Sequence, residues 1–182
     1  MIWRFPESTA IRHLQHGNVI VHATEGVFGL GCRAYDQRAC ARVAALKGRR
    51  TRPFIVVVSD FAQIVTAVDV AQVDFALICA SWPGPETWIL PAARTAPRWL
   101  CGDNCTIAVR VTGHVQFARL CAVAGPMVST SANQPGRKPA QNLLQARNYF
   151  GATVDFYLNG ALETPGRPTR IRDATSGLAL RS

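Results

Sequence analysis

The sequence predicts an α/β fold, in which an open, twisted, mixed β-sheet is flanked by helices. Strand-like runs rich in β-branched residues alternate with amphipathic helical segments along the chain. The run FIVVV (54–58) is apolar throughout, which is typical of a central strand covered on both faces. The chain has 182 residues, 48% of them hydrophobic, so we expect residues 1–182 to form a single domain with a sizeable core.

The first third of the chain contains the clearest signals. A helix is predicted from Ser8 or Thr9 to His16, with Gly17 ending it. NVIVHA (18–23) reads as a strand. TEGVFGLG (24–31) follows, and its three glycines indicate a special turn that needs either close backbone approach or positive φ.

Asp36 is placed to cap a second helix, which Gly48 should end. Ala39, Val43 and Leu46 would share one face of that helix. After the central strand, Asp60 can cap another helical piece. The remaining elements are predicted in chain order: an amphipathic helix (70–82), a rigid turn WPGPET (82–87), strands (87–91 and 106–111), a helix capped by Thr112 that ends near Gly125, a strand (126–132), a helix (140–149), and strands at VDFYL, TRIRD and LALR.

The charge points to anionic partners. Lys and Arg number 20 against 11 Asp and Glu, which gives a formal charge of +9 and a sequence pI near 10.0. Nucleotides, RNA or an acidic surface would fit this excess, although part of it is equally explained by a solvated basic face. The N-terminus has no apolar run typical of a signal peptide, and no stretch could span a bilayer. We therefore expect a soluble, cytoplasmic protein without membrane contact.

The cysteines are interpreted as core residues rather than ligands. Cys32, Cys40, Cys79 and Cys121 lie among apolar neighbours. Cys101 and Cys105 have a loose ligand-like spacing, but no second pair of Cys or His lies near them in the sequence, so no metal site is predicted.

A cationic cluster follows the second predicted helix. Lys47, Arg49, Arg50 and Arg52 lie within six positions. A cation near a helix C-terminus interacts favourably with the helix dipole, by about 0.3–1 kcal/mol, and this would explain Lys47 alone. Four repelling cations are better explained by an anion between them, and Lys with Arg is the usual pair for polyphosphate.

The second candidate site is VSTSANQPGRKP (128–139), where a buried strand runs into a polar loop. Ligands of open α/β sheets bind at such strand ends, and small hydroxyls there can hold a phosphate or ribose. A capped turn, in which Ser and Asn satisfy the local backbone, is the competing interpretation. No G-x-S-x-G elbow is present, so a serine hydrolase is not indicated.

These motifs together resemble one known family. ATEGVFGLG, LKGR, SWPGPETWILP, IAVRV, STSAN and TRIRDATSG occur in an order and spacing similar to the YrdC/TsaC family of threonylcarbamoyl-AMP synthases, in its short bacterial single-domain form. The resemblance runs from about Ala10 to Arg181. It implies an open α/β domain around a positively charged concave groove.

The resemblance also implies a reaction. Such enzymes combine L-threonine, bicarbonate or CO2, and ATP into L-threonylcarbamoyladenylate and pyrophosphate, and Mg²⁺ is expected to accompany the ATP. Separate proteins then transfer the threonylcarbamoyl group to adenosine 37 of tRNAs that read ANN codons. Family members have also been linked to double-stranded RNA, so contact with RNA or tRNA through the groove is a further expectation.

The resemblance assigns roles residue by residue. Lys47 and Arg49 would contact the ATP phosphates as the catalytic cations. For Arg50 and Arg52, a contact with ATP and a contribution to the positive potential of the groove alone are both open. The predicted substrate-binding residues are Thr24, Arg52, Thr87, Thr106, Arg110, Ser129, Ser131 and Asn133. No residue is predicted as a general base and no protein metal ligand is predicted. His22-Ala23 stands where the family commonly has Tyr-Pro or Phe-Pro.

Two rival functions fit parts of the sequence. A basic RNA-binding module without catalysis would use the same cations, but the aromatic residues, 8% of the chain, are not interleaved with Arg and Lys as stacking platforms would be. Hydrogenase-maturation enzymes contain a similar domain, but with acylphosphatase-like and zinc-finger regions that this sequence lacks.

Overall fold

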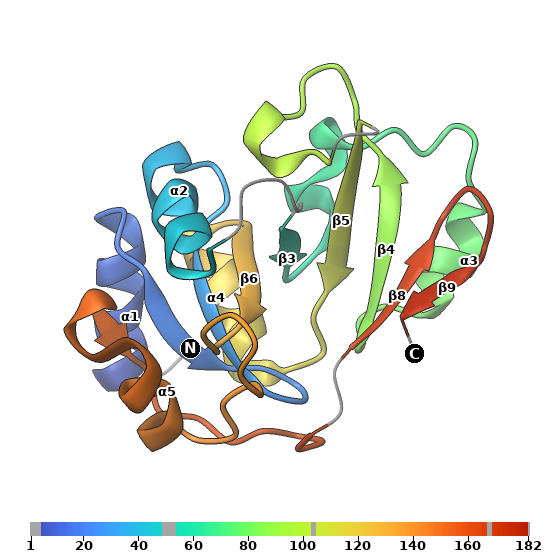
Figure 1. Ribbon diagram of the computed structural model, residues 1–182. Coiled ribbons are helices and arrows are strands. Elements are labelled where there is room, and N and C mark those ends of the chain that lie inside the picture. Colours follow the sequence, from blue (N-terminus) through green and yellow to red (C-terminus); the bar gives the residue numbers. More distant parts are fainter. Residues whose placement is uncertain (1–4, 49–53, 103–104, 167–168, 182) are drawn as a thin grey trace.

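The computed structural model describes residues 5–48, 54–102, 105–166 and 169–181, and these form a mixed sheet flanked by helices (Figure 1). The order of its strands is β7-β1-β2-β6-β3-β5-β4-β8-β9. The pairs β1/β7, β3/β5 and β4/β8 are parallel and the other neighbours are antiparallel. The strands are β1 (Ile20–Ala23), β2 (Phe28–Arg33), β3 (Ile55–Val58), β4 (Glu86–Pro91), β5 (Thr106–Val111), β6 (Met127–Ser131), β7 (Phe156–Tyr157), β8 (Arg170–Asp173) and β9 (Ala179–Arg181).

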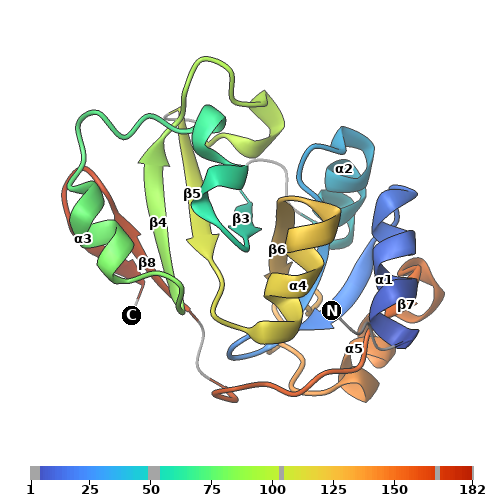
Figure 2. The ribbon, with the colours of Figure 1, turned by 180° about the vertical axis from the view of Figure 1, so that it is seen from behind.

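Two apolar clusters lie on the two faces of the sheet. The helices are α1 (Phe5–Gln15), α2 (Gln37–Leu46), α3 (Phe75–Ala80), α4 (Val115–Ala124) and α5 (Leu143–Phe150). The larger cluster takes residues from α2, α3 and α5, and the smaller one from α1 and α4, which lie side by side in Figure 2. β3 contributes to both, since Val56 and Val58 enter the larger cluster and Val57 the smaller. The prediction of a central strand covered on both faces is therefore confirmed.

Helix α2 also agrees with its sequence signals. The Asp36 carboxylate accepts a hydrogen bond from the Ala39 amide at 2.9 Å, and the helix ends before Gly48, whose φ is 57°. Ala39 and Val43 are buried and Leu46 packs against the same cluster. The helical piece after Asp60 is a single 3-10 turn, Phe61–Gln63.

Several predicted boundaries were wrong, and for three helices the reason is a polar side chain that caps the backbone at another position. The helix expected over 70–82 is only α3, because Asp74 caps it by accepting from the Leu77 amide at 3.0 Å. The helix expected from residue 140 begins at Leu143, after its cap Asn142. His114, not Thr112, caps α4. α1 begins at Phe5, earlier than predicted, and the first strand begins at Ile20.

The second half of the glycine-rich segment, residues 28–31, is a strand rather than a turn. Gly29 and Gly31 lie within β2, and neither has positive φ. A Cβ on Gly31 would lie 2.6 Å from Val128 O and 3.0 Å from His22 Nε2, and one on Gly29 would lie 2.8 Å from Ser129 Oγ. Close approach is thus the correct explanation for these two glycines, and positive φ is wrong.

The cysteines agree with prediction in part. Cys32, Cys40 and Cys121 are buried, but Cys79 is exposed on α3, so its assignment to the core was wrong. Among the described residues, no group of three or more His, Cys, Asp or Glu is placed to hold a metal ion. None of the helices in the part of the chain that the structure describes combines the length and apolar character needed to span a bilayer.

His22 is a fully buried titratable residue in the core. Its ring lies against Phe117 of α4, with centroids 4.1 Å apart. Nδ1 donates to Ala23 O at 3.0 Å, which leaves Nε2 as an acceptor without a hydrogen-bond partner among the described residues. Burial lowers the pKa of His22 from 6.5 to about 4, because a charged imidazole would be desolvated there and would lie near Arg110.

This burial predicts an acid-sensitive fold. Because the unfolded chain binds the His22 proton at a higher pH than the folded chain, stability should fall as the pH drops from 6.5 to about 4. The loss attributable to His22 should approach about 3 kcal/mol at the end of that window. His22→Phe, which keeps a flat ring, should flatten this dependence in urea unfolding measured across the window. The exposed His16→Asn serves as control and should keep the parent slope; an unchanged slope in His22→Phe would contradict the assignment.

Candidate functional site

Lys47 joins two of the predicted site segments. It stands at the C-terminal end of α2 and is 6% exposed. Its ammonium donates to Ser131 O at 2.8 Å, to Asn133 O at 2.6 Å and to Asn133 Oδ1 at 2.8 Å. Three oxygens match the three N–H bonds of an ammonium. The start of the cationic segment and the serine-rich loop therefore lie in contact.

The loop after β6 is held by the Asn133 side chain. Its Oδ1 accepts from Lys47 and also from Ser131 Oγ at 2.7 Å. Its Nδ2 donates to Gln134 O at 3.0 Å and to Arg137 O at 2.7 Å. Both ends of the amide are used within the chain, so its orientation is fixed. These local bonds are also what the capped-turn interpretation expects.

Ser129 differs from its neighbours in the motif. It is 6% exposed and pairs with Gly31 of β2 and with Ile55 of β3. Its hydroxyl makes no hydrogen bond to any described residue, whereas the Ser131 hydroxyl is engaged with Asn133. Since side chains alternate along a strand, Ser129 and Ser131 share one face of β6. Ser129 thus offers a donor and an acceptor that the local structure leaves available.

Thr24 lies at the tip of the β1–β2 hairpin. Its hydroxyl donates to Val27 O at 2.7 Å, and its amide donates to the same oxygen at 3.2 Å. The side chain is 5% exposed and its oxygen can still accept a hydrogen bond. The hairpin turn is therefore closed by Thr24 itself, which fixes the position of its hydroxyl.

A buried ion pair anchors this hairpin to the far end of β5. Glu25 Oε2 faces Arg110 Nη2 at 3.2 Å, and both side chains are about 5% exposed or less. Glu25 Oε1 accepts from the Thr112 hydroxyl at 2.7 Å. Burial lowers the pKa of Arg110, and the charge of Glu25 opposes that shift. The charge of Arg110 is therefore directed to Glu25, and its Nε has no hydrogen-bond partner among the described atoms.

Thr87 and Thr106 lie further along the sheet. Thr87 on β4 is fully buried, and its hydroxyl has no hydrogen-bond partner in the described part of the chain. Thr106 begins β5 opposite Pro91. No hydrogen bond joins either side chain to the other described residues of the predicted site. Arg49, Arg50 and Arg52 lie outside the described residues, so their roles and the positively charged groove stay predictions.

The part played by Glu25 and its partners was not predicted from the sequence. A signal was present, because Arg110 is a charge within the apolar strand TIAVRV, and a buried charge requires an opposite one. Glu25, next to Thr24, was the polar residue of the glycine-rich motif without an assigned role. His114 was equally unassigned; its Nδ1 accepts from the Phe117 amide and its Nε2 donates to Ala161 O.

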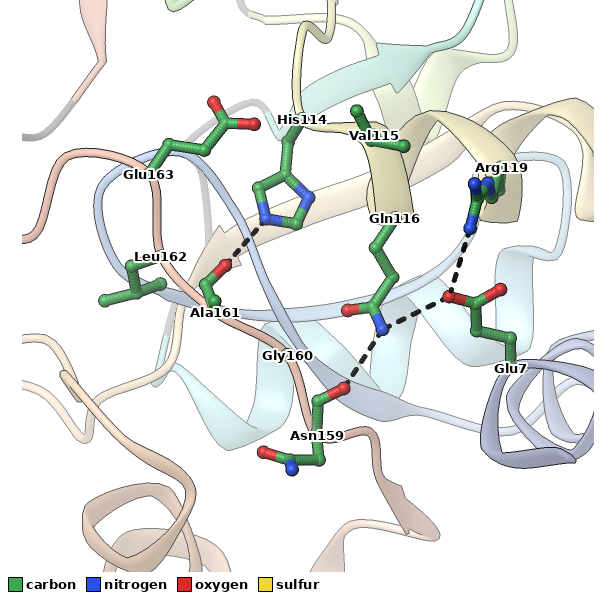
Figure 3. A pocket seen from close by; sticks show the side chains of 10 residues that line it. All are labelled: Glu7, His114, Val115, Gln116, Arg119, Asn159, Gly160, Ala161, Leu162 and Glu163. Carbon is green, nitrogen blue, oxygen red and sulfur yellow. Dashed lines mark hydrogen bonds and ion pairs between the residues drawn. The ribbon is translucent and has the colours of Figure 1, made fainter. Parts of the chain in front are cut away.

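A pocket lies outside this predicted site, beside the first turn of α4 (Figure 3). Its volume is about 600 Å³. The lining residues are Glu7, His114, Val115, Gln116, Arg119, Asn159, Gly160, Ala161, Leu162 and Glu163. None of the predicted substrate-binding residues is among them. One wall is nevertheless tied to the hairpin, because the amides of Glu163 and Thr164 donate to Glu25 O at 3.0 and 2.7 Å.

Sequence comparison finds close relatives over nearly the whole chain. Threonylcarbamoyl-AMP synthase of Halorhodospira halophila is 45% identical over 175 residues, which cover 94% of this chain and 92% of the relative. The protein of the same name from Nitrosococcus oceani is 43% identical over 180 residues, covering 94% and 95%.

Solved structures show the same fold. The crystal structure of E. coli YciO matches with a TM-score of 0.85 at 27% identity, covering 97% of this chain and 88% of that one. P. abyssi Sua5 complexed with L-threonine matches with a TM-score of 0.86 at 26% identity. That match covers 96% of this chain but 52% of Sua5, so this chain spans about half the length of that protein.

A family model named for Sua5, YciO and YrdC, and described as telomere recombination, matches residues 12–182. The chain belongs to the Sua5/YciO/YrdC family.

Proposed function

We propose that this chain, acting as one domain over residues 1–182, condenses L-threonine, bicarbonate or CO2, and ATP into L-threonylcarbamoyladenylate and pyrophosphate. The observation that carries the proposal is the contact of Lys47 with Ser131 and Asn133, which joins the two motifs expected around the nucleotide. The names of the relatives and the threonine complex of P. abyssi Sua5 support the same substrate class. We place the reaction in the cytoplasm, where the product would pass to separate proteins that modify adenosine 37 of tRNA.

The chemistry requires positioning more than covalent help. The threonine amine takes up CO2 and loses a proton, giving a carbamate. A carbamate oxygen then attacks the α-phosphorus, a new P–O bond forms, and the bond to pyrophosphate breaks. Holding reactants in the correct geometry can supply about 7–11 kcal/mol of the barrier in favourable cases. The site would also shield the carbamate, which is unstable in water.

The buried hydroxyls suit the threonine end of this reaction. Thr24 has its hydroxyl fixed by Val27 O and keeps its acceptor lone pairs, so we assign it to the threonine amine. Ser129 keeps an unused donor and acceptor on the face it shares with Ser131, and we assign both to the nucleotide and carbamate. Thr87, Thr106 and Arg110 would border the site, with Arg110 acting through Glu25 to hold the hairpin that carries Thr24.

The cations suit the leaving group. Because the described contacts of Lys47 include three chain oxygens, we infer that it fixes the loop and contributes positive potential, while Arg49 makes the direct phosphate contact. Arg52 would border the phosphates. ATP would enter as its magnesium complex, since Mg²⁺ is usually held by substrate phosphates with few protein ligands.

The proposed activity is tested by following pyrophosphate release from ATP. Release should require both L-threonine and bicarbonate, because both are needed to make the nucleophile. The adenylate should appear in equal amount by mass spectrometry. Release without threonine would contradict the proposal, and so would tight binding of double-stranded RNA with no release under any condition.

Replacing the Lys47 ammonium should impair both the fold and the reaction. Lys47→Met leaves buried oxygens without a donor, so we expect a loss of about 1–3 kcal/mol in the free energy of unfolding and at least a tenfold fall in kcat/KM. Arg49→Ala should lower kcat/KM by a similar factor while leaving stability nearly unchanged.

Urea unfolding and steady-state pyrophosphate release separate these two effects. Lys138→Met is the matched control, because Lys138 is exposed on the same loop and should change neither quantity. Normal turnover in both Lys47→Met and Arg49→Ala would remove the cationic segment from the mechanism.

Ser131→Ala distinguishes a functional hydroxyl from a capped turn. It removes the 2.7 Å hydrogen bond to Asn133 and should lower kcat/KM by about tenfold, with less than about 1 kcal/mol lost in stability. Ser176→Ala removes a comparable 2.9 Å bond to Asp173 in the remote β8–β9 turn and should leave turnover intact. If Ser131→Ala lowered the melting temperature and kept normal turnover, the hydroxyl would serve the turn alone.

A further inference from the structure

We propose that His114 is a positioning residue for L-threonine, which acts by holding residues 159–166 against the hairpin that carries Thr24. We call residues 159–166 the strap. The inference rests on the proposed function, in which Thr24 is assigned to the threonine amine. His114 itself would touch no substrate, because it is 4% exposed and both of its ring nitrogens are used within the chain.

The strap is bonded through its main chain to the tip of the β1–β2 hairpin. The amides of Glu163 and Thr164 donate to Glu25 O at 3.0 and 2.7 Å. The Gly166 amide donates to Gly26 O at 2.9 Å. Both acceptors belong to the turn of the hairpin, so a movement of the strap would move that turn.

The strap also packs on the other side of Thr24. A Cβ on Gly160 would lie 2.9 Å from Ala23 Cβ, a distance that real Cβ atoms essentially never show, so the two backbones approach closely there. Thr24 therefore lies between close packing at Ala23, which precedes it, and hydrogen bonds at Glu25, which follows it. The strap thus constrains the chain on both sides of the hydroxyl that is assigned to the substrate.

His114 attaches the strap to α4. Its Nε2 lies 2.9 Å from Ala161 O (Figure 3), and its Nδ1 lies 3.2 Å from the Phe117 amide nitrogen. A carbonyl oxygen only accepts and an amide N–H only donates, so these two bonds require the tautomer with its proton on Nε2. Gln116 Nε2 donates to Asn159 O at 3.0 Å, which gives the strap a second anchor on the same helix.

His114 is connected to the side chain of Glu25 as well. The His114 amide donates to the Thr112 hydroxyl oxygen at 3.2 Å, and that hydroxyl donates to Glu25 Oε1 at 2.7 Å. Glu25 is therefore held through its carboxylate from the segment that ends at His114, and through its main-chain oxygen by the strap. Hydrogen bonds in such a buried network strengthen one another, and His114 is the residue at which its two branches meet.

A loosened strap should weaken the binding of threonine rather than that of ATP. If the hairpin turn populates other positions, only the fraction of molecules with Thr24 in place can bind the amino acid, and the apparent affinity falls by that fraction. The residues assigned to the nucleotide lie near the contact of Lys47 with the loop after β6, which forms without the strap. The expected signature is a raised KM for L-threonine with an unchanged KM for ATP.

Two substitutions separate the roles of the two ring nitrogens. His114→Asn keeps an acceptor at the position of Nδ1, and asparagine is among the best helix caps, but it has no atom at the position of Nε2. His114→Gln is the matched control, because it keeps an N–H donor at the position of Nε2 and loses the cap. Both variants are compared with the parent protein by pyrophosphate release, by urea unfolding, and by NMR hydrogen exchange at the amides of Glu163 and Thr164.

His114→Asn should raise KM for L-threonine by at least about fivefold, as expected for the loss of one hydrogen bond, with KM for ATP within about twofold of the parent value. The Glu163 and Thr164 amides should exchange faster in this variant, while the urea midpoint stays close to that of the parent. His114→Gln should show the reverse, with a lower urea midpoint and a KM for L-threonine within about twofold of the parent value.

Three results would overturn the inference. One is faster exchange in His114→Asn with an unchanged KM for L-threonine, since the strap would then be loosened without consequence for the substrate. Another is unchanged exchange in that variant, and the third is an equal rise in KM in both variants, which a purely structural role would produce. A parent protein that releases no pyrophosphate would instead refute the proposed function, so the two failures are distinguishable.

Discussion

The contact on which the rest of the site depends is the Lys47 ammonium among the oxygens of Ser131 and Asn133. It joins the end of α2 to the loop after β6, two segments more than 80 positions apart in the chain. A buried ammonium is stable only where several oxygens converge, so the three acceptors fix where the helix ends relative to the loop. The cationic segment therefore starts beside Ser131 and Asn133. The segment and the loop can contact one triphosphate only if they lie this close together.

The second constraint lies across the sheet, where Glu25 meets Arg110 and Thr112. The twist of the sheet brings the tip of the β1–β2 hairpin to the end of β5, and the ion pair holds it there. His22 and the glycines of β2 belong to the same region, because a side chain at Gly31 would collide with the ring and with β6. This region consists of buried polar groups, and their contacts fix the hairpin that carries Thr24.

Much of the fold could be predicted from the sequence, since it rests on local patterns. The apolar run 54–58 identified the central strand, and Asp36 with Gly48 bounded α2. The errors came where long-range partners override local preference. Thr112 is of a residue type that commonly caps helices. Its hydroxyl instead donates to Glu25, which is far away in sequence, and His114 caps α4. The glycines of 24–31 suggested a turn. In the structure, Gly29 and Gly31 make room for the ring of His22, and the segment alone does not reveal that neighbour. For the site, the sequence singled out both segments that meet at Lys47, but it revealed neither the hydrogen bonds of Lys47 to the loop nor the buried role of Glu25.

The most direct test of this account is a crystal structure of the protein with a non-hydrolysable ATP analogue and L-threonine. We expect the triphosphate between the segment that begins at Lys47 and the loop 131–133, with the α-phosphorus facing the threonine amine near Thr24. A nucleotide bound elsewhere, with the contact between Lys47 and Asn133 unchanged and the loop facing solvent, would contradict the central claim.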